Sequence, residues 1–311
     1  MTTGLFTHPA CLGHETPPGH PESVDRLRAV LHELQHIDGL TREEASAASR
    51  EDLALAHDPK LIGKVLDTLA AEAAREHFVR VDADTAMSAG SAEAALRAAG
   101  AVIDACDSVM AGRITNAFCA VRPPGHHAER ARSMGFCLFN NVAVGAMHLR
   151  AKRGLKRIAV IDFDVHHGNG TQDIFWNDPD LFYASTHQWP LYPGTGQPSE
   201  KGVANNVLNA PLPPGAGSEA FRAAMSKIVL PALDSFRPEF VFISAGFDAH
   251  RADPLAELRL DESDYAWATS EICALAAKHC GGRVVSALEG GYDLDALARS
   301  AAAHVGALME A

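Results

Sequence analysis

The sequence predicts an α/β fold in which helices flank a central, mostly parallel β-sheet. Five short apolar runs have the length and composition of buried strands. Helical segments alternate with these runs, and alternation at this spacing is typical of a parallel sheet. A polar cluster follows each run, as expected where strands end at a common ligand-binding edge.

The predicted elements follow one another without a linker. Two N-terminal helices, near 26–35 and 50–71, extend the domain. The predicted strands are 117–121, 157–161, 181–185, 239–244 and 283–288. The remaining predicted helices are 91–110, whose alanines favour a helix, 140–153, 218–237 and 261–280. No Gly/Ser-rich stretch or repeat marks a boundary, so we expect one catalytic domain over residues 1–311.

Composition excludes several classes of protein. The net charge of −12 argues against a general nucleic-acid binder, which usually presents a basic face. The six cysteines form no C-x-x-C pair and predict no disulfide framework. There is no signal-peptide pattern and no apolar run of membrane-spanning length. We expect a cytoplasmic protein that binds neither nucleic acid nor membrane, and a homo-oligomer is left open.

The polar clusters contain the residue types of a metal-dependent active site. They occupy 122–127, 162–167, 185–187, 247–250 and 289–292. Asp162, Asp164 and His166 alternate, so in an extended segment they project to the same side. Asp164 and His166 supply two metal ligands, and Asp248 is the natural third. Three protein ligands with an open position are typical of catalytic zinc, although Co²⁺ or Fe²⁺ would also suit two carboxylates. The alternative is a buried salt-bridge cluster.

His126 and His127 are general acid/base candidates beside a metal-activated water. An imidazole needs a partner on its far nitrogen to fix its tautomer, and Asp162 and Asn169 are the candidates. A carboxylate partner favours a cationic imidazole, whereas an amide partner leaves it closer to neutral. Our hypothesis is that His127, paired with Asn169, is the base and later the acid, while His126 acts electrostatically. Tyr292 follows two glycines and is the candidate to polarise a carbonyl.

Five motifs together resemble those of the zinc-dependent histone deacetylase superfamily, from about Gly19 to the C-terminus. They are R-P-P-G-H-H-A, G-F-C-x-F-N-N, D-x-D-V-H-H-G-N-G-T-Q, S-A-G-F-D-A and E-G-G-Y. Asn169 stands where class I enzymes carry Asp, so the chain is similar to the class II group and its bacterial histone-deacetylase-like amidohydrolases. The resemblance implies an arginase/deacetylase-like fold and a hydrolase of linear amides that removes acetyl or other acyl groups from lysine side chains of proteins or peptides.

The resemblance also implies roles for individual residues. Zinc would be bound by Asp164, His166 and Asp248, with His126 and His127 beside the nucleophilic water and Tyr292 polarising the amide carbonyl. One or two potassium ions are implied. The inner site would comprise Asp162, Asp164, His166, Ser185 and Thr186, and the second would lie near Phe175, Asp178 and Leu181.

For the substrate, the resemblance places Phe136 and Tyr192 in the walls of an acyl-lysine tunnel. Gly135 would meet the substrate backbone, and Asp84 would lie at the rim. Tyr192 stands where the family usually has Phe, which leaves tunnel width open. Leu255 is typical of lysine deacetylases, whereas polyamine-specific relatives carry Glu there to meet a cation. A buried Leu offers no partner to an ammonium group, which favours acetyl-lysine over acetylpolyamine.

Three alternatives remain. The first is an acetylpolyamine amidohydrolase. The second, a ureohydrolase with two manganese ions, needs further Asp ligands. The third, a catalytically weak acyl-lysine reader, would need neither the histidine pair nor Tyr292. Other histidines fit structural roles better, although His14 and His20, with Arg26 below them, are expected near the pocket rim.

Overall fold

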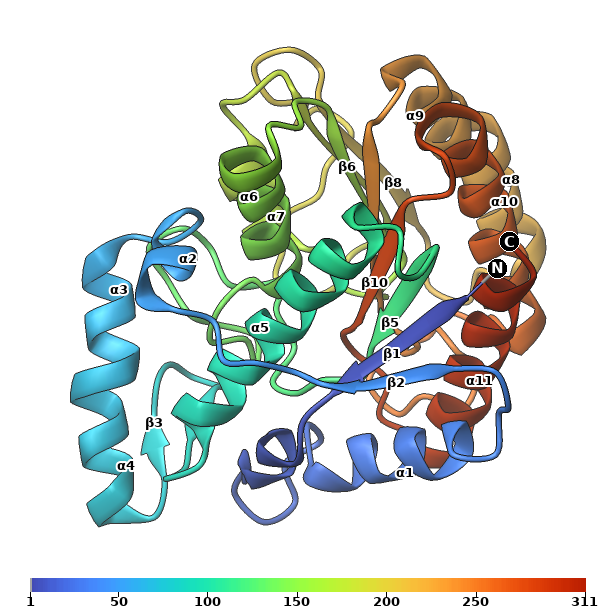
Figure 1. Ribbon diagram of the computed structural model, residues 1–311. Helices are drawn as coiled ribbons and strands as arrows, with labels where there is room; N and C mark the ends of the chain where they lie inside the picture. Colours follow the sequence, from blue (N-terminus) through green and yellow to red (C-terminus); the bar gives the residue numbers. More distant parts are fainter. Residues whose placement is uncertain (1) are drawn as a thin grey trace.

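The computed structural model describes residues 2–311 and contains an eight-stranded parallel sheet with helices on both faces (Figure 1). The strand order is β2-β1-β5-β10-β9-β6-β7-β8, and every pairing in this sheet is parallel. Its strands are β1 (Thr3–Thr7), β2 (Thr41–Glu44), β5 (Asn116–Cys119), β6 (Ile158–Asp162), β7 (Leu181–Gln188), β8 (Val207–Leu212), β9 (Phe240–Ala245) and β10 (Val284–Leu288). A separate antiparallel pair joins β3 (Val79–Arg80) to β4 (Ala86–Met87).

The helices form a layer on each face of the sheet. In Figure 1, α5, α6 and α7 lie on one side, and α1 with α8 to α11 lies on the other. The helical segments are η1 (Pro9–Gly13), α1 (Val24–Leu34), α2 (Arg50–Ala54), α3 (Pro59–Gly63), η2 (Lys64–Leu69), α4 (Ala70–Glu76), α5 (Ser91–Met110), α6 (Asn141–Arg153), α7 (Asn169–Phe175), α8 (Ser218–Ala224), η3 (Met225–Val229), α9 (Leu230–Phe236), α10 (Glu262–Cys280) and α11 (Leu294–Glu310). Among residues 2–311, no helix is long and apolar enough to span a membrane.

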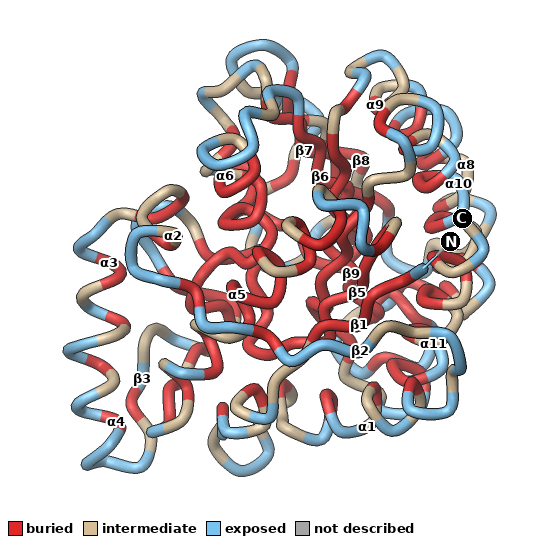
Figure 2. Tube along the Cα trace, in the orientation of Figure 1, coloured by how far each residue is buried: buried red, intermediate tan, exposed pale blue. Residues whose placement is uncertain are grey.

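The central strands explain why the sequence predicts a parallel sheet. Every residue of β6, β7, β9 and β10 is buried, because helices cover both faces (Figure 2). Such strands have continuous apolar runs in place of an alternating pattern. The predicted α/β fold with one sheet is confirmed, and all five predicted strands are present.

Sequence reading missed three strands of the main sheet and wrongly joined two helices. The polar residues of β2 are mostly exposed at one edge, and β8, at the opposite edge, contains a proline that only an edge strand tolerates. The third, β1, has only five residues. The predicted helix over 50–71 is interrupted before Pro59, since the residue preceding a proline avoids helical geometry.

A buried ion network ties the N-terminal segment to the sheet. The Glu22 carboxylate accepts hydrogen bonds from Arg122 Nε at 2.5 Å and from Arg26 Nη1 at 2.9 Å. All three side chains are fully buried. Burial alone would raise the pKa of Glu22, but the adjacent guanidinium groups outweigh it and hold that pKa well below its ordinary value. The network therefore fixes the beginning of α1 against the loop that follows β5.

Replacing Glu22 with alanine should destabilise the fold strongly, because two guanidinium groups would lose their buried counter-ion. We expect Glu22→Ala to lower the free energy of unfolding by about 3–5 kcal/mol in urea denaturation. The matched control is Asp25→Ala, which breaks the solvent-exposed pair of Asp25 with Arg28 and should leave stability close to wild type. Equal losses in the two variants would contradict this role for the network.

Candidate functional site

The structure brings the predicted polar clusters together at the carboxyl ends of the parallel strands. His126 and His127 lie in the loop after β5, and Asp164 and His166 follow β6. Asp248 follows β9, Tyr292 follows β10, and Ser185 with Thr186 lies within β7. The strands β5, β10, β9, β6 and β7 are consecutive neighbours in the sheet, so side chains distant in sequence meet at one edge.

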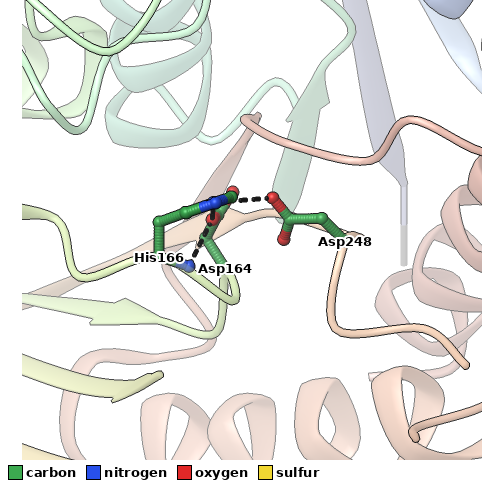
Figure 3. A group of neighbouring side chains, drawn as sticks. All are labelled: Asp164, His166 and Asp248. Carbon is green, nitrogen blue, oxygen red and sulfur yellow. Dashed lines mark hydrogen bonds and ion pairs between the residues drawn. The ribbon is translucent and has the colours of Figure 1, made fainter. Parts of the chain in front are cut away.

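Asp164, His166 and Asp248 form a compact buried cluster (Figure 3). One potential ligand atom from each residue lies within 4.8 Å of the others. His166 Nδ1 is 3.1 Å from Asp164 Oδ1 and 3.1 Å from Asp248 Oδ2. Two carboxylate oxygens and one imidazole nitrogen therefore face a common point, and this donor set fits a divalent metal such as zinc.

The backbone holds the two carboxylates in place. Asp248 Oδ1 accepts a 2.8 Å hydrogen bond from the Val165 N–H, and Asp164 Oδ2 accepts one of 2.8 Å from the Gly290 N–H. Glycine is required nearby: a Cβ on Gly246 would lie 2.0 Å from Asp164 Oδ2, and one on Gly290 would lie 2.1 Å from Asp248 Oδ2. The absence of side chains at these two glycines therefore leaves the space that the carboxylate oxygens occupy.

The electrostatics of this cluster also favour a cation. Burial alone would lower the pKa of His166, but hydrogen bonds to the Asp164 and Asp248 carboxylates raise it to about 10. Burial and the neighbouring Asp164 raise the pKa of Asp248 to about 7. Both shifts reflect the negative charge that is concentrated where the three ligand atoms converge.

The two adjacent histidines have the different partners that the sequence predicts. His126 Nδ1 is 3.0 Å from Asp162 Oδ2, and His127 Nδ1 is 2.8 Å from Asn169 Oδ1. Burial alone would lower the pKa of His126, but the carboxylates of Asp164 and Asp162 raise it well above the ordinary value. Burial and the charges of His126 and His166 lower the pKa of His127 well below the ordinary value. The pair therefore combines a cationic with a neutral imidazole.

Glu129 fixes the orientation of this pair and was missed by sequence reasoning. The Asn169 side-chain Nδ2 donates a 2.7 Å hydrogen bond to Glu129 Oε1, which leaves Asn169 Oδ1 facing His127. An amide oxygen only accepts, so Nδ1 of His127 carries the proton and Nε2 is free to accept one. The position two residues after the histidine pair offered no distinctive sequence signal, since the contact depends on α7 lying beside this loop.

Tyr292 rests on a buried arginine. The Arg26 guanidinium carbon lies 4.8 Å from the centroid of the Tyr292 ring. Arg26 also donates to the carbonyl oxygens of Gly291 at 2.5 Å and Glu289 at 2.6 Å. These contacts fix the loop after β10, with burial raising the pKa of the Tyr292 hydroxyl well above its ordinary value. Arg26 was expected near the rim and instead lies fully buried beneath the tyrosine.

A cavity of about 260 Å³ leads to the cluster. It contains all five residues that the resemblance assigned to substrate binding, together with Leu191, which sequence reading missed. The lining residues are Asp84, His127, Gly135, Phe136, His166, Leu191, Tyr192, Leu255 and Tyr292. Gly135 has a φ of +57°, and a Cβ there would lie 2.5 Å from His127 Cδ2, so only glycine fits beside the His127 ring.

Thr85 joins the rim of this cavity to its wall. Its hydroxyl donates to Asp84 Oδ1 at 3.0 Å and accepts from the Phe136 N–H at 3.0 Å. Phe136 has a φ of +66°, a conformation that costs energy for a non-glycine residue. Of the two expected rim histidines, His20 packs its ring 4.7 Å from Phe136, whereas His14 is buried beside Glu22.

The two predicted potassium sites differ in their geometry. At the inner one, Asp162 and Ser185 are direct neighbours across β6 and β7, and Thr186 Oγ1 is buried without a hydrogen-bond partner within residues 2–311. This oxygen-rich surrounding fits a monovalent cation. At the second, the carbonyl oxygens of Phe175, Asp178 and Leu181 all lie within 3.1 Å of the Asn206 side-chain nitrogen. That arrangement does not fit an ion at the same point.

Comparison with known proteins agrees with this geometry. The family model described as the histone deacetylase domain matches residues 20–308. A probable deacetylase of Archaeoglobus fulgidus is 40% identical over 95% of this chain and 82% of its own length. The histone deacetylase-like amidohydrolase of Pseudomonas aeruginosa is 38% identical over 93% of this chain and 75% of its own length.

A solved structure has the same fold. The crystal structure of the HDA15 HD domain superimposes with a TM-score of 0.93 at 35% identity and covers 99% of this chain and 88% of that one. Together with the family match over nearly the whole chain, this shows that the chain belongs to the histone deacetylase family and is a hydrolase that acts on amides.

Proposed function

We propose that this protein is a zinc-dependent amidohydrolase that removes acetyl groups from the lysine side-chain amine of proteins or peptides. The proposal rests on one observation. The imidazole of His127 and the side chain of Tyr292 line the same cavity as His166, one of the three candidate metal ligands. A protein that only bound acyl-lysine would need neither His127 nor Tyr292.

Asp164, His166 and Asp248 would hold the zinc ion, and Asp162, Ser185 and Thr186 would take part in an inner potassium site. Zinc bound to this donor set supplies Lewis acidity, which polarises a carbonyl and lowers the pKa of water. The remaining chemistry belongs to the side chains of the chain itself.

His127 would act first as the base and then as the acid. Its Nδ1–H donates to Asn169, so Nε2 accepts a proton from the attacking water. The same nitrogen later returns that proton to the leaving amine. His126, held cationic by Asp162 and Asp164, stabilises the negative charge that develops during the reaction.

Tyr292 would stabilise the developing oxyanion by donating a hydrogen bond. Burial keeps its hydroxyl protonated, because its pKa lies well above the ordinary value. The contacts of Arg26 with the ring and with the Gly291 carbonyl limit the movement of this loop. The hydroxyl is therefore held in position before the substrate binds, which is what transition-state stabilisation requires.

The cavity walls support a neutral, extended acyl-lysine side chain as the substrate. Phe136, Leu191 and Tyr192 are apolar or aromatic. The expectation that Leu255 is buried is wrong, because its side chain is 38% exposed, but it still adds an apolar group to the cavity lining. Asp84 lines the cavity, and Asp82 lies beside it, because its carboxylate accepts a 3.1 Å hydrogen bond from the Asp84 N–H. These two carboxylates favour acetylpolyamine instead. Asp84 Oδ1 already accepts a 3.0 Å hydrogen bond from the Thr85 hydroxyl, and its second oxygen would accept a backbone N–H of a peptide substrate.

Removing the hydroxyl of Tyr292 should greatly reduce turnover without loss of metal. We expect Tyr292→Phe to lower kcat by about 100- to 1000-fold, as for loss of one oxyanion donor, with zinc content unchanged by atomic absorption. The control is Tyr265→Phe, since that buried hydroxyl has no hydrogen-bond partner among residues 2–311. Wild-type turnover in Tyr292→Phe would refute the assigned role.

Changing Asn169 to aspartate should shift the pH dependence of the reaction. A carboxylate beside Nδ1 stabilises the imidazolium form and raises the pKa of His127. Because the base must be neutral, the acidic limb of kcat/KM should move to higher pH by about one unit. Circular dichroism and zinc content would control for misfolding and loss of metal. Superimposable profiles of Asn169→Asp and wild type would count against His127 as the base.

The substrate class is tested by assaying zinc-loaded enzyme on an acetyl-lysine peptide, acetylputrescine and acetylspermidine. We expect the peptide to be preferred. Leu255→Glu should change the ratio of kcat/KM for acetylspermidine to kcat/KM for the peptide about 2- to 5-fold in favour of acetylspermidine, because the new carboxylate would pair with an ammonium group of that substrate. The uncharged variant Leu255→Gln should leave the ratio unchanged. Preference of the wild type for the acetylpolyamines would favour the alternative function, and inactivity on all three substrates would support a reader.

A further inference from the structure

A buried amide lies among three backbone carbonyl oxygens between α7 and β8. Asn206, which immediately precedes β8, is only 3% exposed. Its Nδ2 atom lies 3.0 Å from the carbonyl oxygen of Phe175, 3.1 Å from that of Asp178 and 2.9 Å from that of Leu181. The three oxygens come from the end of α7, the following turn and the first residue of β7.

The orientation of this amide is determined by its surroundings. Asn206 Oδ1 accepts a 3.3 Å hydrogen bond from the Ala204 N–H. The opposite orientation would direct an oxygen at three carbonyl oxygens, each of which carries partial negative charge. The nitrogen end, with its partially positive hydrogens, is therefore the end that faces the carbonyls.

There are more carbonyl oxygens around the Asn206 amide than it has hydrogens to donate. An amide nitrogen carries two hydrogens, whereas three oxygens lie within 3.1 Å of it. Converging backbone carbonyls of this kind are the arrangement with which proteins replace the hydration shell of a monovalent cation. The Asp178 carboxylate adds no free negative charge for an ion, because it forms an ion pair with Arg150.

We propose that the Asn206 amide takes the place of the second monovalent cation that the resemblance implies. The carbonyl oxygens of Phe175, Asp178 and Leu181, which we call the carbonyl cage, are then filled by a side chain of this chain. The turn between α7 and β7 is then held by a neutral group and does not depend on potassium. The inference does not rest on the proposed catalytic function, because the cage is separate from the cavity that contains His127 and Tyr292.

Counting bound ions tests the proposal directly. Thallium(I), which substitutes for potassium, can be followed by NMR in the intact, zinc-loaded protein. The wild type should bind at most one thallium ion that potassium displaces, at the inner site beside Asp162. Two such ions in the wild type would overturn the proposal, and this result does not depend on any variant folding.

The variant Asn206→Ala tests whether the cage can bind an ion once the amide is removed. In choline chloride its melting temperature should fall by roughly 5 °C, because all three carbonyl oxygens lose the Asn206 amide, although those of Phe175 and Asp178 keep a backbone donor. Potassium chloride at the same ionic strength should restore part of this loss, and NMR should detect one more thallium ion than in the wild type. A potassium response and ion count equal to those of the wild type would overturn the proposal.

Asn116→Ala is the matched control. Asn116 is also a buried amide, but its Nδ2 donates to a single carbonyl, that of Leu308, at 2.7 Å. Its removal should lower the melting temperature equally in potassium and choline chlorides. Potassium-specific recovery in Asn116→Ala as well as in Asn206→Ala would show a general salt effect and would count against a cage specific to Asn206.

Discussion

The close approach of two buried carboxylates, Asp164 and Asp248, to one imidazole is the constraint on which the rest of the site depends. Like charges in a buried site repel, and they persist only when other groups compensate them. Backbone N–H groups of Val165 and Gly290 provide part of this compensation. The parallel sheet makes this compensation possible, because β10, β9 and β6 are neighbours whose carboxyl ends bring these N–H groups and carboxylates together.

Much of this arrangement could be predicted from the sequence, because it depends on short-range patterns. The alternation of Asp162, Asp164 and His166 and the apolar runs before each cluster are local properties. The contacts of Glu129 and Asn206 could not be predicted, because each involves segments brought together only by the fold: Glu129 meets α7 and Asn206 meets the turn after it. For the same reason, the edge strands β2 and β8 were missed, since exposure and a proline remove the apolar signal.

Two buried arginines support the loops that carry the site. Arg26 and Arg122 are both buried, but they are engaged by the same Glu22 carboxylate. Their roles are geometric: Arg122 precedes the loop of the histidine pair, and Arg26 supports the loop of Tyr292. Glu22 therefore links the segments that carry His127 and Tyr292.

The balance of charge around the carboxylates at the strand ends favours a divalent cation. Asp162, Asp164 and Asp248 lie around His126 and His166, and the buried carboxyl of Glu289 accepts from the His126 N–H at 3.1 Å. This concentration of acidic groups raises the pKa of His166 to about 10 and, together with burial, that of Asp248 to about 7. A divalent ion held by the three ligand atoms would compensate this negative charge at the point where it is greatest.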